Sequence, residues 1–218
     1  MLTRLAALAL ALTTSLTAAS AGGFAKPPAH LAADMVSIAR PTPSWNAVRA
    51  ALGTRRLHNL ASLHTYVTTG VYPHNTYRTG PLNVWRDADG HICAAATIIA
   101  LDHHADLVDE TGKTNVNIRL LDVTSGPLLD WMLTSGLTIE EIDRIQEPGF
   151  MPDRPSEQAY RREDAKLGRD YRATEAYLQK HVGEDLDEAT TRLMARPDLA
   201  RALVSPASAL PDGGAGWE

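Results

Sequence analysis

The residue of this chain best placed to do chemistry is Cys93, its single cysteine. It stands at the predicted start of a helix, where unpaired backbone N–H groups and the helix dipole stabilise a thiolate. A cysteine nucleophile needs such a lowered pKa, together with a histidine that takes its proton. Cys93 is therefore the candidate nucleophile of a cysteine-dependent acyl hydrolase or transferase. Its apolar neighbours Ile92 and Ala94 favour the alternative, in which Cys93 is a small buried residue.

A base for this thiol must come from the histidines of the chain. His91, two residues before the cysteine, is the candidate base, and Asp87 or Asp89 is the candidate to orient it. Other histidines that the fold could bring to the thiol are His58, His64 and His74. His103 and His104 follow on the same predicted helix at roughly 15 Å from the cysteine, which is too far for proton transfer.

His103 and His104 also raise the question of a metal site. They stand among Asp102, Asp106 and Asp109 at the end of the predicted helix. Zinc needs three or four converging ligands, and neither an HExxH motif nor paired cysteines occur. A solvated polar helix end, with histidines near its negative terminus, is the reading that these residues favour. We therefore predict no metal ligand and no cofactor, and keep a metal site around His103 and His104 as an alternative function.

The segment Asp87-Ala88-Asp89-Gly90 begins like a calcium-binding loop. It lacks the further acidic residue before the glycine, and Ile98 occupies the position of the bidentate glutamate. Asp and Gly are also the residues that tight turns prefer. We predict a turn between a strand and a helix.

A loop rich in aromatic and polar residues joins Gly70 to Pro81. Loops of about this length in compact domains often carry function, although many only cross the core. The candidate binding residues in the loop are Tyr72, His74, Asn75, Tyr77 and Arg78.

The first 21 residues predict export. Arg4 precedes an apolar run, and the small residues Ala19, Ser20 and Ala21 follow it. This is the pattern of a secretory signal peptide cleaved near Ala21, which predicts a periplasmic or secreted protein. The run is too short for a retained membrane span, and no later stretch reaches the ~20 apolar residues that a span needs.

The charge balance limits the partners. The chain of 218 residues has a formal net charge of −5, with 26 acidic and 21 basic residues. A basic surface for phosphate backbones is not expected, so we predict no nucleic-acid partner.

Hydrophobic periodicity and capping residues outline the elements. We predict helices over residues 44–52, 55–68, 93–110 and 127–134, a helix capped by Thr138 with Glu141 completing a capping box, and strands over residues 82–86 and 116–123. Charged residues are denser after Gly149. There a long helix carries the apolar stripe Tyr160, Leu167, Tyr171, Leu178 and Val182.

We thus predict a mainly helical α+β fold, with a two- or three-stranded sheet packed by helices. Its parts are a signal peptide (1–21), an exposed leader (22–43), an α+β core domain (44–150), a charged helical arm (151–204) and a disordered tail (205–218). For the arm, docking onto the core is favoured over a free partner-binding helix.

The sequence favours an exported, non-catalytic binding or envelope-associated domain, with an unknown protein or small-molecule partner. The alternatives are the Cys93 enzyme and the metal site around His103 and His104. An exposed Cys93 with a histidine nitrogen within about 3 to 4 Å would favour the enzyme. A buried Cys93, with an exposed aromatic patch near Tyr72 and Tyr77, would favour the binding domain.

Overall fold

A long helix, α1 (Trp45–Thr69), opens the part of the chain described by the computed structural model, residues 41–205. The Ser44 side chain caps it by accepting a hydrogen bond from the Ala47 N–H, and Gly70, at φ 68°, ends it. The predicted signal peptide, the leader up to residue 40 and the tail from residue 206 lie outside the described residues.

The two helices predicted over residues 44–68 are a single helix. Gly53, where we expected the break, lies against α7 (Val182–Met194), and a Cβ placed there would be 3.6 Å from the Leu186 side chain. A glycine inside a helix costs about 1 kcal/mol relative to alanine. Packing of α1 on α7 holds the helix intact across this position.

The remaining elements follow in chain order. They are β1 (Gly80–Leu82), α2 (Ala94–Ile99), the kinked segment η2 (Ala100–His104), α3 (Ala105–Thr114), the 3-10 helix η3 (Leu120–Asp122), α4 (Pro127–Thr134), α5 (Ile139–Ile145), β2 (Gly149–Met151), α6 (Glu157–Lys180), α7 and α8 (Pro197–Val204). The α4 helix has its predicted bounds, and the capping box of Thr138 and Glu141 starts α5 as predicted.

The sheet of the described residues has two antiparallel strands, with Pro81 of β1 opposite Phe150 of β2. Of the strand predicted over residues 82–86, Leu82 belongs to β1, and Arg86 forms an isolated bridge with Ile92.

The strand predicted over residues 116–123 is wrong, because this segment is irregular and contains η3. The Gln146 side chain takes the place of a neighbouring strand. Its Oε1 accepts from the Leu120 N–H at 2.8 Å, and its amide donates to the Ile118 carbonyl at 2.8 Å. Buried backbone groups need such partners, and here an amide side chain supplies them without a strand.

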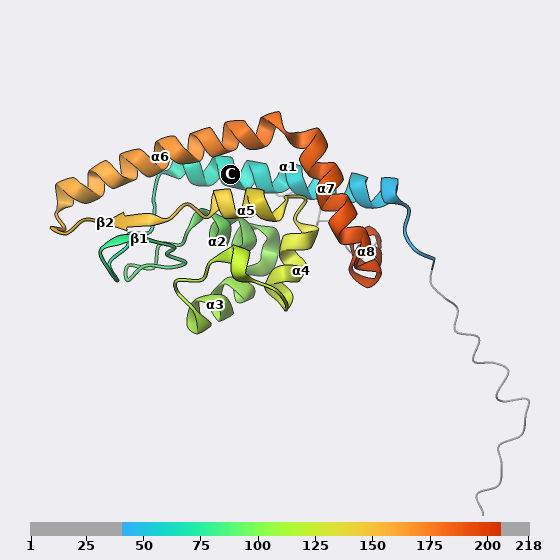
Figure 1. Cartoon of the computed structure of the whole chain (residues 1–218), viewed down its shortest axis with the longest axis horizontal. Helices are drawn as coiled ribbons and strands as arrows, with labels where there is room; N and C mark the ends of the chain where they lie inside the picture. The colour runs from blue at the N-terminus through green and yellow to red at the C-terminus, as the bar shows by residue number, and fades with distance from the viewer. Residues whose placement is uncertain (1–40, 206–218) are drawn as a thin grey trace, which may run out of the picture. The chain divides into compact units, whose positions relative to one another are not determined.

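The charged helix α6 runs beside α1, and α2 to α5 lie below these two helices in the view of Figure 1, with α5 also contacting α6. Leu167, Tyr171 and Leu178 of α6 are buried in the same apolar cluster as Leu63 and Trp85. The segment predicted as an arm is therefore docked, and the boundary predicted at residue 150 falls inside β2. A second cluster packs the start of α1 against α7 and α8.

This architecture confirms the mainly helical α+β fold with a small sheet and a helical C-terminal region. Within residues 41–205, no helix is both long and apolar enough to cross a membrane.

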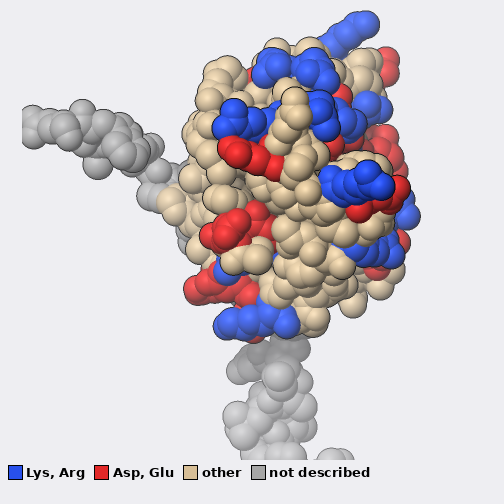
Figure 2. Space-filling model, turned by 90° about the vertical axis from the view of Figure 1, so that its left-hand side faces the viewer, with Lys and Arg blue, Asp and Glu red and all other residues tan. Residues whose placement is uncertain are grey.

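Charges of both signs mix on the end of the molecule that carries β1, β2 and the start of α6. Figure 2 shows Lys and Arg side chains interspersed with Asp and Glu on this face. Several are paired along α6, including Arg161 with Glu157 and Lys166 with Asp170. The mixture on this face agrees with the balanced composition of the chain.

Candidate functional site

Cys93 caps the N-terminus of α2, at the helix start that the sequence predicted. Its Sγ accepts a hydrogen bond from the Ala96 N–H at 3.5 Å, and the residue is 2% exposed. Burial raises the pKa of the thiol to about 11, and the N–H groups of Ala96 and Ala95 offset only part of the rise. The cost of burying a thiolate thus outweighs the stabilisation that the helix N-terminus offers it. The thiol therefore stays protonated at neutral pH. These features do not favour a nucleophile.

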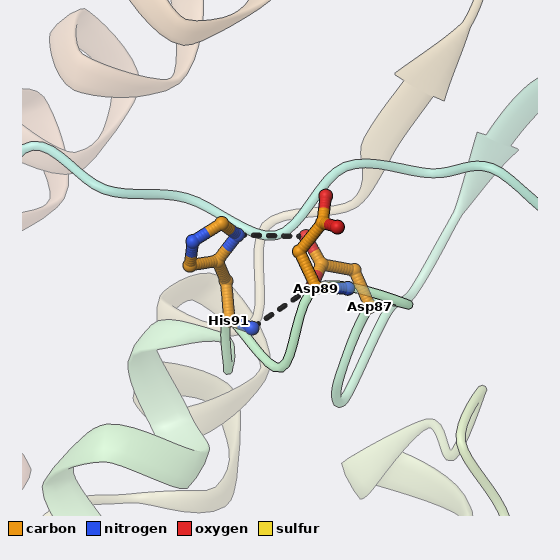
Figure 3. A group of neighbouring side chains, drawn as sticks. All are labelled: Asp87, Asp89 and His91. Carbon is orange, nitrogen blue, oxygen red and sulfur yellow. Dashed lines mark hydrogen bonds and ion pairs between the residues drawn. The ribbon is translucent and has the colours of Figure 1, made fainter.

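The candidate base His91 faces Asp87 rather than the cysteine. Its Nδ1 lies 3.1 Å from Asp87 Oδ2, and its backbone N–H donates to Asp87 Oδ1 at 2.8 Å (Figure 3). Asp87 also accepts from the N–H groups of His74 and Asp89. The segment is therefore the predicted tight turn, organised around one buried carboxylate.

Asp87, Asp89 and His91 also offer ligand atoms that lie within 4.8 Å of one another. Burial raises the pKa of Asp87, but hydrogen bonds from the His74 N–H and from His91 outweigh it and hold the pKa below its usual value. Both Asp87 oxygens are already engaged within the turn, so a cation here would compete with four hydrogen bonds. Over residues 41–205 this is the one such trio of potential ligands, and His103 and His104 do not belong to it.

The predicted binding loop is held down by its own side chains. Asn75 is buried, and its amide donates to the carbonyls of Arg78 and Gly80 while its Oδ1 accepts from two N–H groups of the loop. The His74 ring stacks on Tyr160 and lies 3.0 Å from Asp164, both on α6. Asn75 and His74 thus have clear structural roles.

Tyr72 is buried with Tyr66 and Tyr171, with ring centroids 5.3 to 5.4 Å apart. Of the five candidate binding residues, Tyr77 and Arg78 have exposed side chains. Tyr77 also donates its hydroxyl hydrogen to the Arg86 carbonyl at 2.9 Å. The aromatic patch expected around Tyr72 and Tyr77 is therefore reduced to Tyr77.

The helix predicted over residues 93–110 is interrupted by η2. Asp102 and His103 leave helical geometry, and His103 has φ 64°. Within residues 41–205 it is the one non-glycine residue with positive φ. A residue in this region costs about 1–3 kcal/mol, and such strained residues cluster at functional sites. The periodicity of the sequence did not reveal this interruption.

The interruption places a buried carboxylate between two other helices. Asp102 is 2% exposed. Its Oδ1 lies 2.6 Å from Arg55 Nη1 on α1, and its Oδ2 accepts from the Trp131 indole N–H on α4 at 2.8 Å. The Nε2 atoms of His58 and His104 lie 3.9 and 4.0 Å from the same carboxylate.

This network forms one wall of a pocket of about 350 Å³ between α1, α3, α4 and α8. The volume is in the range of small-molecule sites, which combine apolar walls with a few polar groups. The polar lining side chains are Arg55, His104, Asp130 and Thr134, and the apolar ones are Leu107, Pro127, Trp131, Leu199, Ala202 and Leu203.

Sequence reasoning singled out Asp102 and His104 only as part of an acidic, histidine-rich helix end. It missed Arg55 and Trp131, which are separated from Asp102 by 47 and 29 positions. No local pattern links residues at such separations. The one signal in the sequence was an aspartate within an apolar helical stripe, because a buried charge requires partners.

In comparisons with known proteins, no protein-family model, no curated protein and no solved structure matches this chain.

Proposed function

We propose that this chain is an exported, non-catalytic binding domain that takes a small ligand in the pocket between α1, α3, α4 and α8. The pocket is the observation that carries the proposal. Its walls are helices, which position side chains more firmly than loops do. Asp102, Arg55 and Trp131 fix its polar wall through hydrogen bonds of 2.6 and 2.8 Å.

The chemistry of Cys93 supports binding over catalysis. An acyl-transfer enzyme needs a thiolate within reach of a base. Here the thiol is buried and its pKa is raised, and the candidate base His91 is engaged with Asp87.

Labelling of Cys93 tests the enzymatic alternative. We expect a small thiol reagent to react with the folded protein only slowly from about pH 5 to pH 9, and rapidly after denaturation. Rapid labelling of the folded protein with an apparent pKa well below the ordinary ~8.5 would contradict the proposal and support Cys93 as a catalytic nucleophile.

Binding in the pocket is tested with 1-hexanol, hexanoate and hexylammonium, which share one apolar chain. We expect at least one of them to shift the amide NMR signals of the four pocket helices without being converted. The variant Ala202→Trp fills the pocket from α8 and should abolish these shifts. Ala176→Trp, at an exposed position of α6, is the matched control and should keep them. Absence of all three responses in the unmodified chain would overturn the proposal.

Export is proposed from residues 1–21, which lie outside the described residues. We expect the chain, produced in a bacterial host, to be recovered outside the cytoplasm with its new N-terminus near Gly22. Arg4→Glu combined with Leu8→Glu should leave it uncleaved in the cytoplasm. Recovery of the unaltered chain uncleaved in the cytoplasm would contradict export.

A further inference from the structure

We propose that the pocket selects a small monocarboxylate with an apolar body, bound through its carboxylate to Arg55. This inference rests on the proposed function, since it names the class of ligand for that same pocket. It follows from the hydrogen-bonding groups that the pocket still offers and from the arrangement of its apolar side chains.

The polar wall has spare donors and few spare acceptors. A guanidinium carries five N–H donors, and within residues 41–205 one hydrogen bond, from Nη1 to Asp102, joins Arg55 to the protein. Both Asp102 oxygens are already bonded, one to Arg55 and one to Trp131. The Arg55 side chain is 18% exposed and lines the pocket. A ligand head group here should therefore accept hydrogen bonds.

The remaining charges of the pocket agree with an anionic head group. Asp130 also lines the pocket, but its carboxylate lies 3.3 Å from Arg196 and is compensated there. His104 also lines the pocket, with Nε2 4.0 Å from the Asp102 carboxylate. Arg and carboxylate form planar, charge-assisted pairs, so a carboxylate fits this wall better than an alcohol does.

The apolar lining of the pocket suits an apolar body. Leu107 of α3 and Leu199 and Leu203 of α8 line it. Burying a CH₂ group is worth about 0.8 kcal/mol, so a short alkyl or branched apolar chain adds affinity here. The ligand thus has a carboxylate head at Arg55 and a body in contact with the apolar lining residues.

Titration calorimetry or NMR titration with three probes of equal chain length tests this inference. We expect hexanoate to bind about tenfold more tightly than 1-hexanol, and hexylammonium to bind more weakly than 1-hexanol. Equal affinities, or a preference for hexylammonium, would overturn the carboxylate inference and leave the pocket as a binding site. If none of the three binds, the proposed function itself fails.

Two variants separate recognition by Arg55 from a structural role. Arg55→Gln should weaken hexanoate binding far more than 1-hexanol binding, so that the two affinities become similar. Asp102→Asn keeps an acceptor for Trp131 but removes the charge that competes for Arg55, so it should tighten hexanoate binding. If Arg55 and Asp102 have only a structural role, both variants should lower the affinity for all three probes alike. That result would overturn the inference.

Arg55→Gln alone leaves the buried Asp102 charge without its partner and could unfold the protein. The double variant Arg55→Gln with Asp102→Asn replaces the ion pair by a neutral amide pair and keeps the test decisive. We expect it to fold and to bind hexanoate no better than 1-hexanol. Retention of the hexanoate preference in this double variant would show that Arg55 does not hold the carboxylate.

Discussion

Gly136 shows at the residue scale how a backbone position can depend on the absence of a side chain. It has φ 78°, in the region that favours glycine. A Cβ built there would lie 2.2 Å from the Leu52 carbonyl oxygen and 2.7 Å from the Arg56 nitrogen. Both contacts are with the backbone of α1, which cannot rotate away. The turn before α5 thus approaches α1 as closely as a glycine allows.

We therefore expect Gly136→Ala to lower the free energy of unfolding by about 3 kcal/mol or more, from backbone strain and overpacking together. Gly70→Ala is the matched control, because Gly70 has φ 68° in the left-handed helical region but open space around its Cβ position. It should cost only about 1 kcal/mol. Chemical denaturation of both variants checks the difference, and equal losses would show that the close approach to α1 is not a constraint.

At the scale of elements, one buried arginine joins α1 to three other parts of the fold. Arg56 is 1% exposed and pairs with Glu141 of α5 through bonds of 2.6 and 2.7 Å. It also donates to the Gly136 carbonyl and to the Leu178 carbonyl near the end of α6. Asp185 of α7 lies 3.9 Å away. The capping box of α5 shares the same glutamate.

Removal of this arginine should be costly. Arg56→Leu is expected to lower the free energy of unfolding by about 3–5 kcal/mol, because Glu141 remains buried without its counter-charge. Adding Glu141→Gln removes that charge and keeps an acceptor for the Thr138 N–H, so the double variant should recover part of the loss. Denaturation of the single and double variants measures this coupling; a double variant that is the sum of both single losses would contradict it.

Asp185 gives the same cluster a pH dependence. Burial raises the pKa of Asp185 to about 6, with Glu141 adding to the rise and Arg56 opposing it. The folded state therefore holds this proton more tightly than the unfolded state does. Stability from this group is present below about pH 4 and is lost as the pH rises through about 6.

Asp185→Asn should remove the loss of folding stability that occurs as the pH rises through about 6. The variant is expected to be more stable than the unmodified chain at pH 7, with the difference shrinking as the pH falls from about 6 to about 4. Denaturation midpoints across this range test it, with the exposed Asp153→Asn as the control for loss of a surface carboxylate. A stability difference that does not change with pH would contradict the raised pKa.

At the scale of the whole molecule, the predicted boundary at residue 150 divides one core. Tyr171 and Leu178 of α6 fill the cluster that also contains Leu63 and Trp85. We expect the fragment of residues 44–150 to show no cooperative thermal transition, since it exposes this cluster. The fragment of residues 41–205 should unfold cooperatively. A cooperative transition in the shorter fragment would restore residues 44–150 as a domain of their own.

The features that were predicted correctly from the sequence depend on residues close to one another in the chain. The caps at Ser44 and Thr138 and the stop at Gly70 act within three or four residues, so they are visible in the chain itself. The side chain of Gln146 that replaces a strand, and the pairing of Asp102 with Arg55, join residues far apart in the chain. Local patterns carry no information on such partners, and this is why the pocket was missed.

The position of Arg56 also has a consequence for the order of folding. Its partners Gly136, Glu141 and Leu178 are 80, 85 and 122 positions away in the chain. These bonds can form only after three distant segments have met, so we expect them to form late in folding. We expect Arg56→Leu mainly to accelerate unfolding and to change the refolding rate little. The native state would then owe its lifetime to a contact that takes no part in nucleating it.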